Sequence, residues 1–228
     1  MASSNEVPNW LWRTVTVGFF AVLAGVGALA IALSLGAADP PRAGPLAWDE
    51  IFQGDVSRWE LGASEGASIQ VRGGALVAEF TAPGQTAWAI TAAPTGSYTL
   101  EIAAAQAQGE IGAEYGVVFD WRSEAEHAAV LINGNGYAEA FRQTGGGQAA
   151  WFPFQQWPHI LYGAEANRVR VDVAGERVSA RINDELLFET ADLRGFENPE
   201  GLKLGVFARA EGAGQVVFGW VKVWVEEK

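Results

Sequence analysis

The chain has 228 residues, of which 27 are acidic and 15 are basic, and its formal net charge at pH 7 is −12. This acidic balance argues against a nucleic-acid partner, because such proteins need a basic surface. The sequence has no cysteine and two histidines, which excludes disulfides, thiolate metal sites and cysteine nucleophiles; we therefore expect neither a metal nor a cofactor.

Residues 14–38 contain no charged side chain and follow a short N-terminal tail, residues 1–13. About 20 apolar residues are enough for a helix to cross a bilayer. Trp10, Trp12 and Arg13 precede the run, as is typical of a membrane–water interface on the cytoplasmic side. The alternative is a cleaved signal peptide, but the run exceeds the usual length of its apolar region. We predict a transmembrane helix at residues 14–38, with the N-terminus cytoplasmic and the C-terminal domain extracytoplasmic.

Small residues recur along this segment at spacings of three and four, which places them on one helix face: Gly18, Ala21, Gly25, Ala28 and Ala32. Such a stripe lets another membrane helix approach closely. The alternative is that glycine and alanine are simply common in membrane helices. The stripe predicts a membrane-protein partner in addition to the lipid bilayer.

Residues 39–45 are rich in proline, which predicts a stiff, extended linker. Residues 46–228 then show recurrent strand patterns. Valines at 169, 171 and 173 alternate with polar residues, and a second alternating run follows at 177–182, which predicts a hairpin. The pattern at 115–122 places Tyr115, Val117, Phe119 and Trp121 on one side of a strand.

Further strands are predicted at residues 137–143, 204–209 and 215–225, the last as a central strand because it is apolar on both faces. Residues 123–131 are read as a short helix. Many short strands with glycine-rich turns predict an all-β fold, a two-sheet antiparallel jelly-roll sandwich behind the helix.

The segments YGVVFDW, NRVRVDVAGERVSARINDELL and GLKLGVFARAEGAGQVVFGWVKVW, in this order, resemble the concanavalin-like jelly roll of bacterial 3-keto-disaccharide hydrolase and laminin-G-like domains. The likeness covers roughly residues 48–226. It rests on strands and turns and therefore implies a fold more than an activity. At residues 183–184 the related pattern commonly has Asn-Gly, whereas this chain has Asn-Asp, which alters the turn and not the fold.

Catalytic motifs are absent from the sequence. Laminarinase-type glycosidases on this fold carry Glu-x-Asp-x-x-Glu on one strand, and no glutamate here begins that pattern. Retaining glycosidases need two carboxyls about 5–5.5 Å apart. Asp120 and Glu139 are the candidate pair, since neighbouring strands could bring them together; the alternative is two solvated surface carboxylates. Whether the chain is an enzyme stays open, with the balance against.

The strongest candidate binding surface is aromatic. Trp151, Phe152, Phe154, Trp157 and His159 follow a run of three glycines and are expected in a loop, and we add Tyr137 to them. Aromatic rings stack on sugars and anchor protein contacts, although some of these rings are expected to plug the core. Arg168, Arg170, Arg177 and Arg181 are expected on a solvated strand face.

Together these features predict a single-pass, membrane-anchored, non-catalytic extracytoplasmic binding module that serves as an accessory or interaction subunit of a larger membrane assembly. The alternatives are a carbohydrate-binding receptor module and, third, a glycoside hydrolase acting on 3-keto-disaccharides. The missing carboxylate motif disfavours the third.

Overall fold

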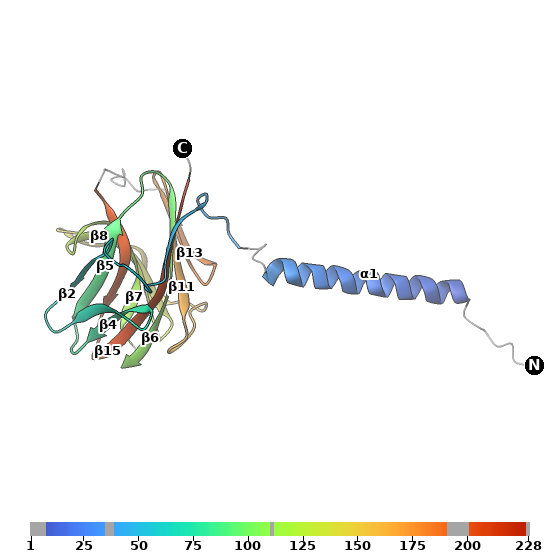
Figure 1. Ribbon diagram of the computed structural model, residues 1–228, viewed down its shortest axis with the longest axis horizontal. Helices are drawn as coiled ribbons and strands as arrows, with labels where there is room; N and C mark the ends of the chain where they lie inside the picture. Colours follow the sequence, from blue (N-terminus) through green and yellow to red (C-terminus); the bar gives the residue numbers. More distant parts are fainter. Residues whose placement is uncertain (1–7, 35–38, 110–111, 191–200, 227–228) are drawn as a thin grey trace, which may run out of the picture. The chain divides into compact units, whose positions relative to one another are not determined.

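The computed structural model describes residues 8–34, 39–109, 112–190 and 201–226, and Figure 1 shows the arrangement of its elements. The chain divides into two compact units, residues 1–41 and residues 42–228. The first holds helix α1 and the second a two-sheet β-sandwich.

Helix α1 runs from Asn9 to Ser34. Its segment Trp10–Ala32 is long and apolar enough to cross a membrane. The stripe of small residues falls on this helix, and the positions where Gly18 and Gly25 would carry a Cβ atom are open. Residues 35–38 of the predicted span lie outside the described residues. The division of the chain at residues 13, 38 and 45 stays a prediction.

The strands form two antiparallel sheets. The first sheet has the order β13-β12-β11-β6-β15-β4-β3, with β1 beside the far end of β15. Its strands are β1 (Leu46–Glu50), β3 (Ser68–Arg72), β4 (Ala75–Phe80), β6 (Tyr98–Gly109), β11 (Asn167–Ala174), β12 (Arg177–Ile182), β13 (Glu185–Thr190) and β15 (Gly214–Val225).

The second sheet has seven strands in the order β10-β9-β8-β7-β14-β5-β2. They are β2 (Glu60–Ala63), β5 (Thr86–Ala92), β7 (Glu114–Ser123), β8 (Glu126–Asn133), β9 (Tyr137–Thr144), β10 (Gly147–Gln156) and β14 (Lys203–Arg209). The predicted all-β sandwich is confirmed.

The main core lies between the sheets and follows from strand alternation, since every second side chain of a strand points to the same face. Val169 and Val171 of β11 meet Val117 and Phe119 of β7 in one buried cluster. The predicted hairpin is present as β11 and β12. Strand β15 is central, as predicted, between β6 and the pair β4 and β1. Its outer face, however, is only half buried.

Three expectations are corrected. Residues 123–131 are not a helix: a turn joins β7 to strand β8, whose alternate residues pack on opposite faces of the sheet. The aromatic segment after Gly147 is the edge strand β10 as far as Gln156, and not a loop. Trp121 does not share a face with Phe119, because Asp120 has a φ of 47° and the register of β7 shifts there.

The turn at Asn183–Asp184 is confirmed, and its backbone explains the residue types. Both residues have a positive φ, 53° and 71°, a region that asparagine and aspartate tolerate better than other non-glycine residues. The Asn183 side chain also ties three segments together. Its Oδ1 accepts the backbone N–H of Arg168, and its Nδ2 donates to His159 O and Asn167 Oδ1.

The outer face of the eight-stranded sheet carries charges in pairs, and we call it the ion-pair face: Arg42, Arg168, Arg170, Arg177 and Lys222 with Glu101, Asp172, Asp184, Glu189 and Asp49. The sequence suggests that all of its arginines are solvated, but Arg170 is only 3% exposed and pairs with Asp172. Arg42, from the proline-rich segment, donates to buried Glu101 at 3.0 Å and lies over the Trp224 ring. The end of that segment is therefore docked on the sandwich.

Candidate functional site

The seven-stranded sheet also packs side chains on its outer face, away from the other sheet. Seven buried residues form a second apolar cluster there: Ile90, Val118, Trp121, Ala129, Leu131, Phe141 and Phe207. They alternate along the strands with residues of the main core. Beside this cluster, where β7 and β9 begin and β8, β10 and β14 end, is a cavity of about 530 Å³. We call this side of the sandwich the cavity face.

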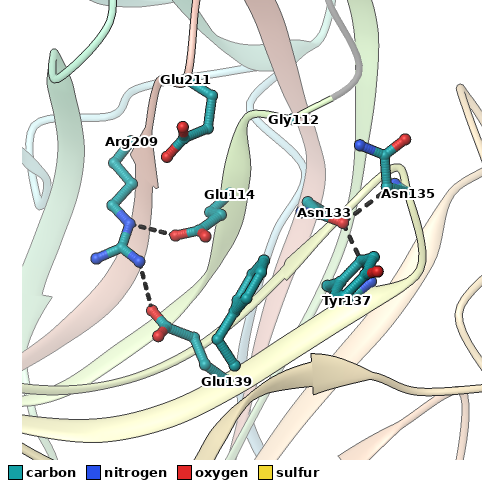
Figure 2. A pocket seen from close by; sticks show the side chains of 9 residues that line it. Gly112, Glu114, Asn133, Asn135, Tyr137, Glu139, Arg209 and Glu211 are labelled. Atoms are coloured by element: carbon teal, nitrogen blue, oxygen red, sulfur yellow. Dashed lines mark hydrogen bonds and ion pairs between the residues drawn. The ribbon is translucent and has the colours of Figure 1, made fainter.

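Figure 2 shows the side chains that line the cavity. They come from five strands and their connections: Gly112, Glu114, Asn133, Asn135, Tyr137, Glu139, Phe154, Arg209 and Glu211. Glu114 and Glu139 point outward because they are in the strand positions that alternate with the core residues Tyr115 and Ala140. Arg209, at the end of β14, reaches the same space.

Arg209 holds two buried carboxylates at once (Figure 2). Its Nη2 donates to Glu139 Oε1 at 2.7 Å, and its Nε donates to Glu114 Oε2. Both glutamates are about 5% exposed. Burial raises the pKa of Glu139, while the charge of Arg209 opposes that shift and the charge of Glu114 adds to it. The guanidinium thus offsets part of the cost of two desolvated negative charges.

An aromatic pair forms another wall of the cavity. The rings of Tyr137 and Phe154 stack with centroids 5.0 Å apart and planes inclined by 13°. Both stay accessible, with exposed fractions of 37% and 49%. Two large rings held parallel at the surface of a cavity are a platform for the apolar face of a ligand.

The turn between β8 and β9 shapes the third side of the cavity. Asn133 Oδ1 accepts the backbone N–H groups of Asn135 and Tyr137, both at 3.1 Å. Gly136 has a φ of 84°, and a Cβ there would lie 2.8 Å from the Tyr162 ring. A glycine is therefore required at this position on two grounds. The turn at residues 133–136 thus brings the side chains of Asn133 and Asn135 to the cavity.

The predicted aromatic residues divide between core and cavity. Trp151 packs against Phe119 of the main core, and Phe152 and Trp157 are partly buried against the same core. Phe154 joins Tyr137 at the cavity. His159 is exposed, and its ring lies 5.5 Å from that of Trp157. The register of β10 shifts between Ala150 and Phe152 and again between Phe152 and Gln155. These irregularities interrupt the alternation of faces, so one segment supplies both kinds of ring.

The candidate carboxylates Asp120 and Glu139 have different partners. Asp120 lies 3.4 Å from Arg142 and 3.6 Å from Arg122, and its Oδ1 accepts no hydrogen bond within the described residues. Burial raises its pKa, and the two arginines oppose the shift. The carboxylate that shares a counter-ion with Glu139 is Glu114, which the sequence analysis did not single out.

Glu114, Arg209, Glu211 and the amide of Asn133 are the cavity residues that sequence reasoning missed. A signal existed for Glu114. It is the lone charge of the otherwise apolar stretch EYGVVF, and a charge in a buried strand needs a partner. The partner itself, Arg209, is 95 residues away in β14 and leaves no local mark. No group of three or more metal-binding side chains occurs in the described part of the chain.

No family model and no curated protein matches the sequence. Solved structures do match the fold. The carbohydrate recognition domain of Emp46p, in its potassium-bound form, is 10% identical with a TM-score of 0.60, over 78% of this chain and 96% of that one. The GH43 protein BlXynB from Bacillus licheniformis is 13% identical with a TM-score of 0.59, over 78% of this chain and 39% of that one.

A beta-1,3-glucanase from Mycobacterium marinum is 14% identical with a TM-score of 0.54, over 80% of this chain and all of that one. At these identities the likeness shows the fold alone, a concanavalin-like jelly roll that occurs among lectin and glycoside hydrolase domains. The fold implied by the sequence resemblance is thus present.

Proposed function

We propose that the chain is a membrane-anchored, non-catalytic module that binds a glycan in the cavity of the seven-stranded sheet. The observation that carries the proposal is the exposed, stacked pair Tyr137 and Phe154 beside polar side chains in one cavity. Sugars present apolar C–H faces to aromatic rings and hydroxyl groups to amides and carboxylates. The carbohydrate-binding neighbours of the fold support this choice of ligand.

The absence of catalysis rests on how the carboxylates are held. Glu114 and Glu139 both accept hydrogen bonds from Arg209. The charge of Arg209 favours the ionised form of both carboxylates, which disfavours proton donation, and the ion pairs fix the position of each carboxylate. The cavity residues therefore bind and orient rather than attack.

Binding by the full chain in detergent micelles, screened on a glycan array and then measured by calorimetry, tests this function. Phe154→Ala and Tyr137→Ala should each weaken binding tenfold or more, because anchoring rings in binding sites contribute about 2 kcal/mol. Leu186→Ala is the matched control, since Leu186 is also an exposed apolar side chain but lies on β13 of the other sheet. Equal losses in all three variants, or none, would reject the cavity as the site.

In this proposal the apolar helix determines where in the cell the module acts. Residues 14–38 span the membrane once, the N-terminus is cytoplasmic and the sandwich is extracytoplasmic. The stripe from Gly18 to Ala32 packs against a membrane-protein partner, so the chain is an accessory subunit of a larger assembly. Gly25→Leu should abolish co-purification of that partner in mild detergent without unfolding the sandwich. Protease added to intact cells with a permeable outer layer should digest the sandwich.

A glycoside hydrolase is the second candidate, and one observation favours it. Glu139 has a raised pKa and lies with a second carboxylate in a cavity, as the proton donor of a glycosidase does. Turnover of a 3-keto-disaccharide or a β-glucan that stops in Glu139→Gln and in Glu114→Gln would establish it and overturn the non-catalytic proposal.

A further inference from the structure

The cavity carries more negative than positive charge. Its charged lining residues are Glu114, Glu139, Glu211 and Arg209, so three carboxylates face one guanidinium and leave a net charge of about −2 when all are ionised. The ion pairs of the ion-pair face, in contrast, join five carboxylates to five basic side chains. The excess is therefore a property of the cavity and not of every charged surface.

Arg209 does not satisfy this excess. Its two bonds engage one oxygen of Glu114 and one of Glu139. Glu211 is exposed, and its charge also acts on Arg209. Figure 2 shows its carboxylate on the same side of the cavity as Arg209 and Glu114. A cation entering the cavity would meet three carboxylates that lie around Arg209.

Asn133 supplies an independent sign of a ligand. It is 4% exposed, and its Oδ1 must face the two backbone N–H groups that it accepts. This fixes the orientation of the amide, so Nδ2 points elsewhere. That NH₂ group donates to no described residue, although Asn133 lines the cavity. The NH₂ group is not among the buried polar atoms that lack a partner in the described residues, so it is accessible from the cavity. A hydroxyl or ring oxygen of a bound ligand could accept its hydrogen bond.

The ring pair also attracts a cation. The faces of Tyr137 and Phe154 carry the negative end of the ring quadrupole, which draws positive charge. Carboxylates, ring faces and one amide donor thus converge on a ligand that has an ammonium group, an apolar ring face and hydroxyl oxygens.

We infer that the cavity selects an amino sugar with a free, protonated amine over the corresponding neutral or N-acetylated sugar. The inference rests on the proposed glycan-binding function and specifies its ligand. Acetylation would remove the positive charge and leave the excess negative charge of the cavity unmatched in the complex. Discrimination of this kind comes as much from unpaired groups in the wrong complex as from contacts in the right one.

Calorimetry on the full chain in detergent micelles tests the inference with three oligosaccharides of equal length, built from glucosamine, N-acetylglucosamine and glucose. We expect the glucosamine oligomer to bind at least tenfold more tightly than the other two. Its affinity should fall when the salt concentration rises from about 10 mM to about 150 mM, because salt screens exposed charges.

Glu211→Gln should weaken binding of the glucosamine oligomer about threefold to fivefold, as expected for one partly exposed charge pair, and leave the other two oligomers unchanged. Glu176→Gln is the matched control: it removes the same charge from an exposed turn of the other sheet. An equal effect of both variants would mean attraction to the acidic chain as a whole and would overturn the inference.

The outcomes separate the two proposals. If the neutral oligomers bind as well as the glucosamine oligomer, through Tyr137 and Phe154, then the charge selection is wrong and the glycan-binding function stands. If no oligosaccharide of a broad array binds, the proposed function fails as well.

Discussion

The two outer faces of the sandwich stabilise buried charged side chains in different ways. Both bury charged side chains on strands, where a lone charge would be unstable. On the ion-pair face, buried Glu101 is matched by Arg42 at 3.0 Å and by Arg168 at 3.8 Å. On the cavity face, buried Glu114 and Glu139 share Arg209. The first arrangement is an excess of partners and the second a shortage.

The difference distinguishes a structural face from a binding face. A charge network with matched partners contributes to the fold and gains nothing from a ligand. A network short of one sign of charge, bordering a cavity, retains free energy that a ligand of the opposite sign can recover. The following predictions test this contrast, from the largest effect to the smallest.

Removing the single cation of the cavity should have the largest effect. Arg209→Met leaves two buried carboxylates without their counter-ion, which typically costs about 3–5 kcal/mol of unfolding free energy. Arg177→Met is the control on the other face, where the pair with Glu189 is exposed and 4.0 Å long, and should cost less than about 1 kcal/mol. Urea denaturation at neutral pH measures both. Equal costs would remove the contrast between the faces.

The edge strand β10 offers a second test, because its rings divide between core and cavity. Trp151→Ala removes a ring that packs on Phe119 and Phe188 and should destabilise the chain by about 3 kcal/mol. Phe154→Ala removes a half-exposed ring and should change the stability by less than about 1 kcal/mol while weakening glycan binding. A thermal unfolding series compares them. Loss of folding in Phe154→Ala would make that ring part of the core.

The docked end of the proline-rich segment gives the third prediction. Arg42→Ala removes one partner of Glu101 and the cation over Trp224. Since Arg168 remains near Glu101, we expect a loss of about 1–2 kcal/mol, the value of a hydrogen bond to a charged group. Limited proteolysis should then cut the chain near residue 42 faster than in the wild type. Unchanged stability and proteolysis would mean that the segment contributes nothing to the fold.

These faces also show how far the sequence could be read. Alternating valines in 169–173 and the Asn-Asp turn predicted β11, β12 and the sandwich, because period and turn chemistry are local. Residues 123–131 were misassigned to a helix since alanine-rich, charged stretches favour one, and only pairing of β8 with β7 and β9 overrides that preference. Trp121 changed faces because of one left-handed residue, Asp120, which no periodicity reveals.

The candidate site was predictable in part. Tyr137, Phe154 and Glu139 were selected, and the structure brings all three to one cavity. Their grouping with Arg209 and Glu114 depends on strand order, since β14 lies between β7 and β5. That order results from long-range packing, which leaves no mark in a single sequence.

The smallest expected effect concerns pH. Burial raises the pKa of Glu139 in the folded chain above its ordinary value. The folded state therefore binds this proton more tightly than the unfolded state, so the group contributes stability at low pH. That contribution is lost as the pH rises through the raised pKa. Arg209 limits the loss without cancelling it.

Glu139→Gln removes the titrating group, so its unfolding free energy should fall less than that of the wild type between about pH 4.5 and pH 7. Glu176→Gln, in an exposed turn of the other sheet, should keep the slope of the wild type. Urea midpoints measured across this range give the three slopes. If Glu139→Gln instead loses stability more steeply than the wild type as the pH rises, then the ionised carboxylate is favoured by its pairing with Arg209. The cavity face would then be as well matched in charge as the ion-pair face, and the case for a cationic ligand would lose its basis.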